Sequence, residues 1–245
     1  MAITSTHNRK LKEIRKLRMR KRWRERSHRF VAEGEDLLAA ADAAGWTAVE
    51  RYCVAGSGLP GEEVDEKLLA SASGIGSGTR TLAVYEERWA PQPVGPLCVY
   101  LHSVHDPGNV GAVLRSAEAF GASSVVLGPG SADPFGPKAV RASMGAIFTV
   151  AVAKEGPLPG VRIALVPGRG VGLNELWRSG SEGSNQIANV RGEATLMVGA
   201  EREGLPEELV AAAEHIAHIP IKTNSLNAAM ATTVALYELS HRITT

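Results

Sequence analysis

One segment of the sequence combines an amide, a glycine and a guanidinium near the expected start of a helix. The turn Asp106-Pro-Gly precedes Asn109, which is a good helix cap. The apolar stripe of this helix consists of Val110, Val113, Leu114, Ala117 and Phe120. Arg115 lies on the opposite side, with Gly111 one turn before it, so we expect space there for a ligand phosphate or ribose. A solvated surface arginine is the alternative.

A carboxylate in a second segment has no structural explanation. The apolar run Thr195 to Val198 leads into Gly199, and Glu201 follows at the carboxyl end of this expected strand. Glu207 and Glu208 stand at the start of the next helix, opened by a proline, where they complement the helix dipole. Glu201 has no such role, so it is a candidate catalytic or ligand-binding residue.

A third segment has more helix-capping side chains than one helix can use. Thr223, Asn224 and Ser225 can each cap the last helix, but only one of them can hold that position. Asn227, which we expect in the first turn, can hydrogen-bond a substrate or a neighbouring loop. Redundant capping is the alternative interpretation.

The elements that position these residues are expected to form a parallel α/β sheet. Six apolar runs have the length of strands: Leu97 to Leu101, Ser124 to Leu127, Phe148 to Val152, Arg162 to Val166, Thr195 to Val198 and Ile216 to Ile221. Helical patterns near 109–120, 137–144, 172–178, 206–214 and 225–241 lie between or after them. Such alternation is typical of parallel sheets, whose ligands bind at the carboxyl ends of the strands. We therefore expect the site in the loops after Leu101, Val198 and Ile221.

The first ninety residues predict a separate, smaller α/β unit. A basic helix is expected over 8–26, further helices near 35–44 and 64–72, and strands near 49–54 and 81–85. The segment Ala90-Pro-Gln-Pro-Val-Gly-Pro is poor material for helix or strand. The expected organisation is thus a domain over 1–90, a linker over 91–96 and a second domain over 97–245.

The net charge of +1 hides a strong asymmetry along the chain. Twelve Lys and Arg against two Glu give the first thirty residues a charge of +10, and the remainder carries −9. A basic arm on an acidic body favours a polyanionic partner, although a solvated tail is the alternative. The expected phosphate contacts are Arg9, Lys10, Lys12, Arg15, Lys16, Arg18, Arg20, Lys21, Arg22 and Arg24.

The three segments together resemble the SpoU/TrmH family of the SPOUT superfamily of RNA methyltransferases. The family pattern N-x-G-x-x-x-R, then A-x-x-x-G, matches Asn109, Gly111, Arg115, Ala117 and Gly121. Its pattern G-x-E-x-x-G-L matches Gly199, Glu201, Gly204 and Leu205, and its I-P followed by S-L-N matches Ile219, Pro220, Ser225, Leu226 and Asn227. Segment 133–145 resembles the family's linking region, and Phe30-Val-Ala-Glu-Gly resembles the start of a small ribosomal-protein-like substrate-binding domain.

The resemblance implies a fold, a cofactor and a reaction. The C-terminal domain is expected to be tied in a trefoil knot that holds S-adenosylmethionine against Gly199, Ile219 and Leu226. The expected reaction is methylation of a ribose 2′-hydroxyl in ribosomal or transfer RNA by a homodimer. The expected catalytic residues are Arg115, Asn109, Glu201, Ser225 and Asn227. Arg115 is expected to act as a base or to orient a phosphate and stabilise the developing alkoxide, and Arg141 in the linking region to bind RNA.

Other classes of function find less support in the sequence. The two cysteines, Cys53 and Cys98, lie in apolar stretches without Cys-x-x-Cys spacing, so we expect no metal site. No apolar run is long enough for a membrane span, and the charged N-terminus does not resemble a secretory signal, so a cytoplasmic protein is expected. Two alternatives remain: methylation of an RNA base by the same fold, and a non-catalytic RNA- or ribosome-binding protein.

Overall fold

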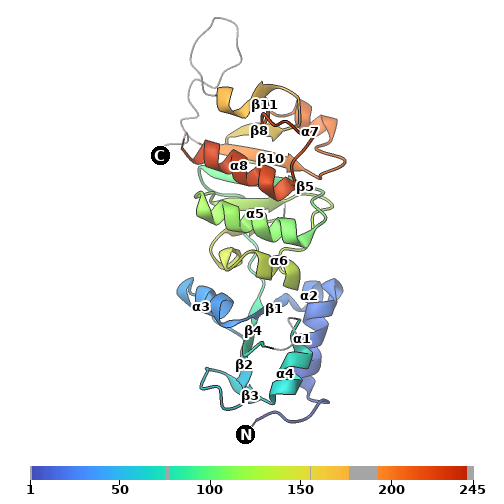
Figure 1. The fold of residues 1–245 in the computed structure, drawn as a ribbon, viewed down its shortest axis with the longest axis vertical. Helices are drawn as coiled ribbons and strands as arrows, with labels where there is room; N and C mark the ends of the chain where they lie inside the picture. Colours follow the sequence, from blue (N-terminus) through green and yellow to red (C-terminus); the bar gives the residue numbers. More distant parts are fainter. Residues whose placement is uncertain (1, 75–77, 155, 177–192, 242–245) are drawn as a thin grey trace, which may run out of the picture.

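The computed structural model describes residues 2–74, 78–154, 156–176 and 193–241, which form two β-sheets stacked along the long axis of the molecule (Figure 1). The smaller sheet has the strand order β1-β4-β2-β3. Its strands are β1 (Arg29–Glu33), β2 (Glu50–Val54), β3 (Glu62–Val64) and β4 (Thr81–Glu86). Its helices are α1 (Arg9–Met19), α2 (Lys21–Ser27), α3 (Glu35–Ala43) and α4 (Glu66–Ala72).

The larger sheet has seven strands in the order β7-β6-β5-β10-β8-β11-β9, and every neighbouring pair is parallel. The strands are β5 (Leu97–His102), β6 (Ser124–Leu127), β7 (Ala151–Ala153), β8 (Val161–Leu165), β9 (Val171–Gly172), β10 (Ala194–Gly199) and β11 (His215–His218). The helices are α5 (Pro107–Ala119), α6 (Pro137–Ala142), α7 (Glu207–Ala211) and α8 (Ala228–Ser240), with short 3-10 turns at Ala146–Phe148 and Leu173–Glu175. The predicted parallel α/β sheet is therefore confirmed.

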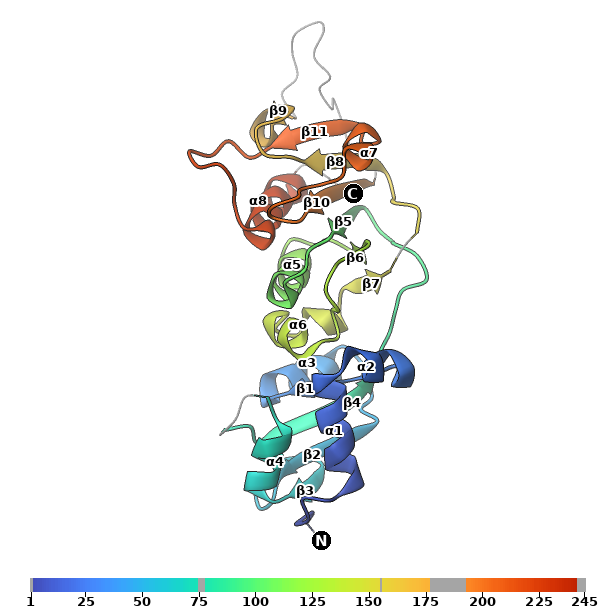
Figure 2. The ribbon, with the colours of Figure 1, turned by 90° about the vertical axis from the view of Figure 1, so that its right-hand side faces the viewer.

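Helices α5 and α8 lie side by side against the larger sheet (Figures 1 and 2). The hydroxyls of Ser116 and Thr233 are 2.6 Å apart where the two helices meet. The predicted apolar stripe of α5 is buried except for Phe120, which is partly exposed. Both helices begin on the same side of the molecule, at the right in Figure 1. Their first turns therefore approach the loops that follow the strands.

Three predicted helices differ from the observed ones. The basic helix expected over 8–26 is interrupted at Arg20, whose backbone is extended (φ −128°, ψ 107°), so α1 and α2 are separate helices. Leu11, Ile14 and Leu17 bury one face of α1 as their spacing predicts. The helix expected over 172–178 is a 3-10 turn where the structure describes it, and 177–178 lie outside the described residues. The helix expected over 206–214 is confined to α7.

The two sheets share one continuous hydrophobic core. The ring of Phe30 lies 4.9 Å from that of Phe135, measured between centroids, and Trp46 lies 5.2 Å from Phe148. Trp46 Nε1 also donates a hydrogen bond of 2.8 Å to the carbonyl oxygen of Phe148. Aromatic contacts of this kind bury large apolar areas and resist relative movement of the parts they join. The small unit is thus firmly packed on the larger one.

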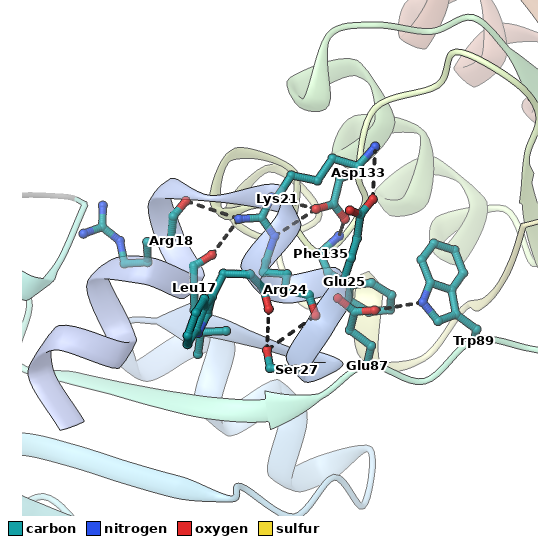
Figure 3. Close-up of polar contacts among 11 residues, drawn as sticks. Leu17, Arg18, Lys21, Arg24, Glu25, Ser27, Glu87, Trp89, Asp133 and Phe135 are labelled. Carbon is teal, nitrogen blue, oxygen red and sulfur yellow. Dashed lines mark hydrogen bonds and ion pairs between the residues drawn. The ribbon is translucent and has the colours of Figure 1, made fainter. Parts of the chain in front are cut away.

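A buried ion pair adds to this junction (Figure 3). Arg24 is 6% exposed, and its Nε and Nη2 donate to Oδ2 of Asp133 at 2.8 and 2.7 Å. Its Nη1 donates to the carbonyl oxygen of Leu17 at 2.6 Å. The expectation that Arg24 contacts an RNA phosphate is therefore wrong, because the guanidinium is buried and already bonded within the chain.

Candidate functional site

Three of the predicted residues meet at one carboxylate oxygen. Oε1 of Glu201 accepts hydrogen bonds from Asn227 Nδ2 at 2.7 Å, from Asn109 Nδ2 at 2.9 Å and from the backbone N–H of Ala228 at 3.4 Å. Asn227 Nδ2 also lies 3.0 Å from Asn109 Oδ1 and donates to it. We call Asn109, Glu201 and Asn227 the polar triad. It links the first turn of α5, the loop after β10 and the start of α8.

The helix caps explain why the Nδ2 groups of both asparagines can bond to Glu201. The cap of α5 is Asp106, which accepts from Gly108 N, so the prediction that Asn109 caps this helix is wrong. Asn109 instead lies in the first turn with its amide free for Glu201. Asn227 is itself the cap of α8, and its Oδ1 accepts from the N–H groups of Ala229 and Met230 at 2.9 and 3.3 Å. Its Oδ1 therefore caps α8, while its Nδ2 donates to Glu201 and Asn109.

Two glycines allow the loop after β10 to bring Glu201 to this place. Gly204 has φ +68°, in the left-handed region that favours glycine, and Ala200 pairs with it across the turn. A Cβ on Gly199 would lie 2.1 Å from the carbonyl carbon of Gly204. A side chain at position 199 would therefore push the returning loop away from the strand end.

A cavity of about 860 Å³ adjoins the triad. Three segments form its wall, namely 165–168 after β8, 198–204 after β10 and 218–226 after β11. The predicted cofactor residues Gly199, Ile219 and Leu226 all line it, as do Glu201 and Ser225. Its size and mixture of apolar side chains with backbone groups are typical of sites for nucleoside-sized ligands. These residues therefore fit S-adenosylmethionine.

The wall formed by 165–168 was not predicted from the sequence, which pointed to the loop after Leu101 instead. Pro167, Gly168 and Gly170 follow the predicted strand directly, and a Pro-Gly-x-Gly turn at a strand end could have indicated it. Arg169 ties this loop to α7, since its Nη1 and Nη2 lie 2.8 and 2.9 Å from the carboxylate oxygens of Glu207. This ion pair is exposed, and the Arg169 guanidinium lowers the pKa of Glu207 below its usual value.

Arg115 is not brought to the triad within one chain. Its side chain is exposed on α5 and makes no hydrogen bond or ion pair with any residue that the structure describes. The space expected beside it over Gly111 is also absent, since a Cβ there would lie 2.3 Å from the Ala139 carbonyl oxygen and 2.7 Å from the Ala142 Cβ. Gly111 therefore serves the close packing of α5 on α6, and that prediction of a ligand space is wrong.

The predicted RNA-contacting cations fall into two groups. Arg9 and Lys12 are exposed on α1 and Arg141 is exposed on α6. Several others contact neighbouring side chains: Lys10 lies 2.6 Å from Glu62, Arg15 lies 2.8 Å from Ser71, and Lys16 lies over the Trp23 ring at 4.3 Å. The neighbouring Arg18 forms an ion pair with Glu33, with Nε and Oε1 2.6 Å apart. Exposed cations continue along the surface at Arg20, Lys21, Arg22 and Arg26.

No helix among the residues that the structure describes is long and apolar enough to cross a membrane. No group of three or more His, Cys, Asp or Glu side chains in the same residues is placed to hold a metal ion.

Sequence comparison relates the chain to RNA-modifying enzymes. Residues 96–237 match the model of the SpoU rRNA Methylase family, and residues 8–90 match that of the MRM3-like substrate binding domain. A 23S rRNA (guanosine(2553)-2'-O)-methyltransferase of Bacillus subtilis is 26% identical over 97% of this chain and 98% of its own length. A 23S rRNA (uridine(2479)-2'-O)-methyltransferase of Streptomyces viridochromogenes is 31% identical over 54% of this chain and 48% of its own.

Structural comparison gives the same relationship. The AdoMet-bound rRNA methyltransferase of Sinorhizobium meliloti superposes with a TM-score of 0.83 and 28% identity, over 100% of this chain and 99% of that one. The SpoU methyltransferase AviRb of Streptomyces viridochromogenes, in complex with AdoMet, has a TM-score of 0.80 over 96% of this chain and 98% of its own. At 22% identity the second likeness shows the fold alone.

Proposed function

The chain belongs to the SpoU rRNA Methylase family, and from this membership we propose that it methylates a ribose 2′-hydroxyl of ribosomal RNA with S-adenosylmethionine as the donor. One observation carries the proposal: the polar triad stands at the edge of a cavity of nucleoside size. The relatives named above support ribose as the acceptor and ribosomal RNA as the substrate. Methylation of transfer RNA is the second candidate, and methylation of a base has no relative in its favour among them.

The cofactor, when bound, supplies a sulfonium-bound methyl group, and residues of the cavity wall would bind and position it. Gly199, Ile219 and Leu226 would hold it along the cavity wall. On transfer the bond from sulfur to methyl would break as the bond from the 2′-oxygen to methyl forms, S-adenosylhomocysteine would be the leaving group, and the hydroxyl proton would pass to water. A hydroxyl is a poor nucleophile, so alignment and charge stabilisation are what the protein must add.

The triad aligns the acceptor side of the reaction. With three donors on Oε1, the carboxylate of Glu201 is fixed at the cavity edge, and its other oxygen is available to a ribose hydroxyl. Ser225 lies on the same wall and adds a hydroxyl. Arg115 stays protonated because a guanidinium does not release its proton in proteins, so its role is to orient a phosphate and stabilise the developing alkoxide.

We further propose that two copies of the chain complete the site. Met230, Val234 and Tyr237 lie on one side of α8 and are 63%, 40% and 52% exposed. Their spacing of four and three residues makes a continuous apolar stripe, which a second copy of the chain would cover. A homodimer would also bring Arg115 of one chain near the cavity of the other. We also propose that the C-terminal domain is tied in the trefoil knot that the family resemblance implies.

The small N-terminal unit is proposed to bind the RNA. This assignment rests on its match to a substrate binding domain and on the exposed cations of α1 and α2. The division into 1–90, 91–96 and 97–245 is kept as a proposal. We also propose a cytoplasmic location, which a role on ribosomal RNA supports.

Incubation of the purified protein with methyl-labelled S-adenosylmethionine and unmodified ribosomal RNA tests the proposal. We expect label in RNA, at a nucleotide whose 2′-O-methyl group blocks alkaline cleavage of the chain. Titration with S-adenosylmethionine by calorimetry tests cofactor binding separately. Label on a base would show the base-methylating alternative, and absence of cofactor binding would show a non-catalytic protein.

A further inference from the structure

A second cavity, of about 210 Å³, lies at the junction of the two sheets (Figure 3). Its wall is formed by Lys21 and Glu25 of α2, by Glu87 and Trp89 after β4, by the turn 127–134 after β6, and by Lys154 after β7. Part of the wall thus comes from the small unit and part from the larger sheet. We call this the junction pocket.

The junction pocket lies between the basic surface and the methyl-transfer site. Because all strands of the larger sheet are parallel, β6 and β10 end at the same edge, the first beside the junction pocket and the second beside the larger cavity. Only β5 separates them, so their ends are roughly 10 Å apart. An RNA strand that runs from α2 to the larger cavity would pass over the junction pocket.

One half-buried carboxylate in the pocket keeps hydrogen-bonding capacity for a ligand. Asp133 is occupied, since Oδ2 accepts from Arg24 and Oδ1 accepts from the backbone N–H of Phe135 at 2.9 Å. Glu25 is paired with Lys21 at 3.8 Å. Glu87 accepts from Trp89 Nε1 at 3.0 Å through Oε2, and its Oε1 has no partner among the residues that the structure describes. Glu87 is half-buried, and this burial raises the pKa of its carboxyl group above the usual value.

The rim of the pocket carries groups that suit a polynucleotide. Lys154 Nζ lies 4.4 Å from the centre of the Trp89 ring and is exposed, as is Lys21 on the α2 side. These ammonium groups can contact phosphates on either side of a nucleotide whose base is inside. Trp89 contributes to the pocket wall, with Lys154 over its ring and the Phe135 ring 5.1 Å away between centroids, so a base would contact the indole where these groups leave it open.

We propose that the junction pocket binds one guanine base of the substrate RNA, close in sequence to the nucleotide that is methylated. This inference rests on the proposed function for its ligand class. Guanine fits because its N1–H and 2-amino group present adjacent donors, which the free Oε1 and the second lone pair of Oε2 of Glu87 can both accept. Uracil presents one N–H between two carbonyl oxygens, and those oxygens would face the carboxylate unfavourably.

Fluorescence anisotropy with eight-nucleotide labelled RNAs tests the pocket. The probes are all-uridine RNA and the same RNA with one central guanosine, adenosine or cytidine. We expect the wild-type protein to bind the guanosine probe at least fivefold more tightly than the all-uridine probe. Glu87→Gln should bind both equally, because its amide keeps the Trp89 hydrogen bond but adds a donor where guanine also donates. Equal binding of all probes by the wild type would overturn the proposal.

Glu86→Gln is the matched control, since Glu86 is exposed at the end of β4 and outside the pocket wall. It should keep the guanosine preference of the wild type. A preference that survives in Glu87→Gln would overturn the proposal. Calorimetric titration with S-adenosylmethionine and methyl transfer to ribosomal RNA report on the proposed function alone, so the two inferences fail independently.

A cross-link gives a second test that does not depend on any variant folding. The central guanosine of the probe is replaced by 6-thioguanosine, which forms zero-length photo-cross-links, and the attached peptide is identified by mass spectrometry. We expect the cross-link at Trp89 or within 127–134. A cross-link confined to other parts of the chain would overturn the assignment of this base to the junction pocket.

Discussion

Asn109 and Asn227 donate to the same oxygen of Glu201, at 2.9 and 2.7 Å, although 118 positions separate them in the sequence. Each asparagine lies in the first turn or at the cap of its helix, so the shared carboxylate connects the starts of α5 and α8. A single carboxylate therefore links the first turns of two helices beside the cavity. Substitutions that preserve each helix start but break this connection should separate folding from function.

Asn227→Ser provides that separation. Serine caps a helix about as well as asparagine but is too short to reach Glu201. Because Glu201 is exposed, water can replace the lost donor in the resting protein, so the free energy of unfolding should fall by less than about 1 kcal/mol. Lost hydrogen bonds to a carboxylate are worth about 1.5–3 kcal/mol, which corresponds to roughly a 10- to 100-fold fall in methyl transfer if they act in the transition state. Urea unfolding and initial rates measure the two effects. Equal loss in both would show that Asn227 is only a cap.

Arg115→Ala should abolish methyl transfer while S-adenosylmethionine affinity stays within a few fold of wild type. The reason is that Arg115 does not line the cavity but is available to a substrate phosphate and the developing alkoxide. Arg115→Lys keeps the charge without the bidentate geometry, so it should recover part of the rate. Calorimetry and single-turnover kinetics make the comparison. Turnover of the alanine variant at the wild-type rate would remove Arg115 from the mechanism.

The sequence predicted which residues come together in the triad better than it predicted their local geometry. Apolar periodicity places α5 and the strands within a few residues, because burial of one face determines both. Which residue caps a helix depends on competition among neighbouring side chains, so Asp106 and Asn227 were not identified as caps. Gly111 was assigned to a ligand because the approach of α6, thirty residues later, leaves no local signal. The break at Arg20 also lacks a glycine or proline to mark it.

The exposed cations of α1 and α2 should determine the salt dependence of RNA binding. The triple variant Arg9→Ala, Lys12→Ala, Arg22→Ala removes three charges that have no ion pair within the described chain. The slope of log K against log salt should fall by about 2 if all three contact single-stranded phosphates. Lys67→Ala, on the exposed face of α4, is the control and should leave the slope unchanged. A triple variant with the wild-type slope would place the RNA elsewhere.

Acid should lower the stability of the folded protein partly by protonating Glu214 and removing its ion pair with Arg162. Hydrogen bonds from Arg162 lower the pKa of Glu214 from its usual 4.5 to about 2. A depressed carboxyl pKa stabilises the folded state above pH 4.5, and this contribution is lost as the pH falls from 4.5 through about 2. Because the pair is largely exposed, the effect should be modest. Glu214→Gln should therefore flatten the fall in melting temperature over that range, and an unchanged profile would contradict the assignment.

The buried pair of Arg24 and Asp133 should stabilise the junction, and the Arg24 guanidinium should do so without touching RNA. The two side chains are 7% and 14% exposed, so Arg24→Met or Asp133→Asn leaves a desolvated charge, at a cost of about 3 kcal/mol in unfolding free energy. The double variant should lose less than the sum of the single losses, because neither charge is then left alone. Chemical unfolding of all four proteins gives this coupling energy. Arg24→Met should also keep the wild-type salt slope of RNA binding, since its guanidinium is covered. A reduced slope would instead mean that the junction opens on RNA and exposes Arg24.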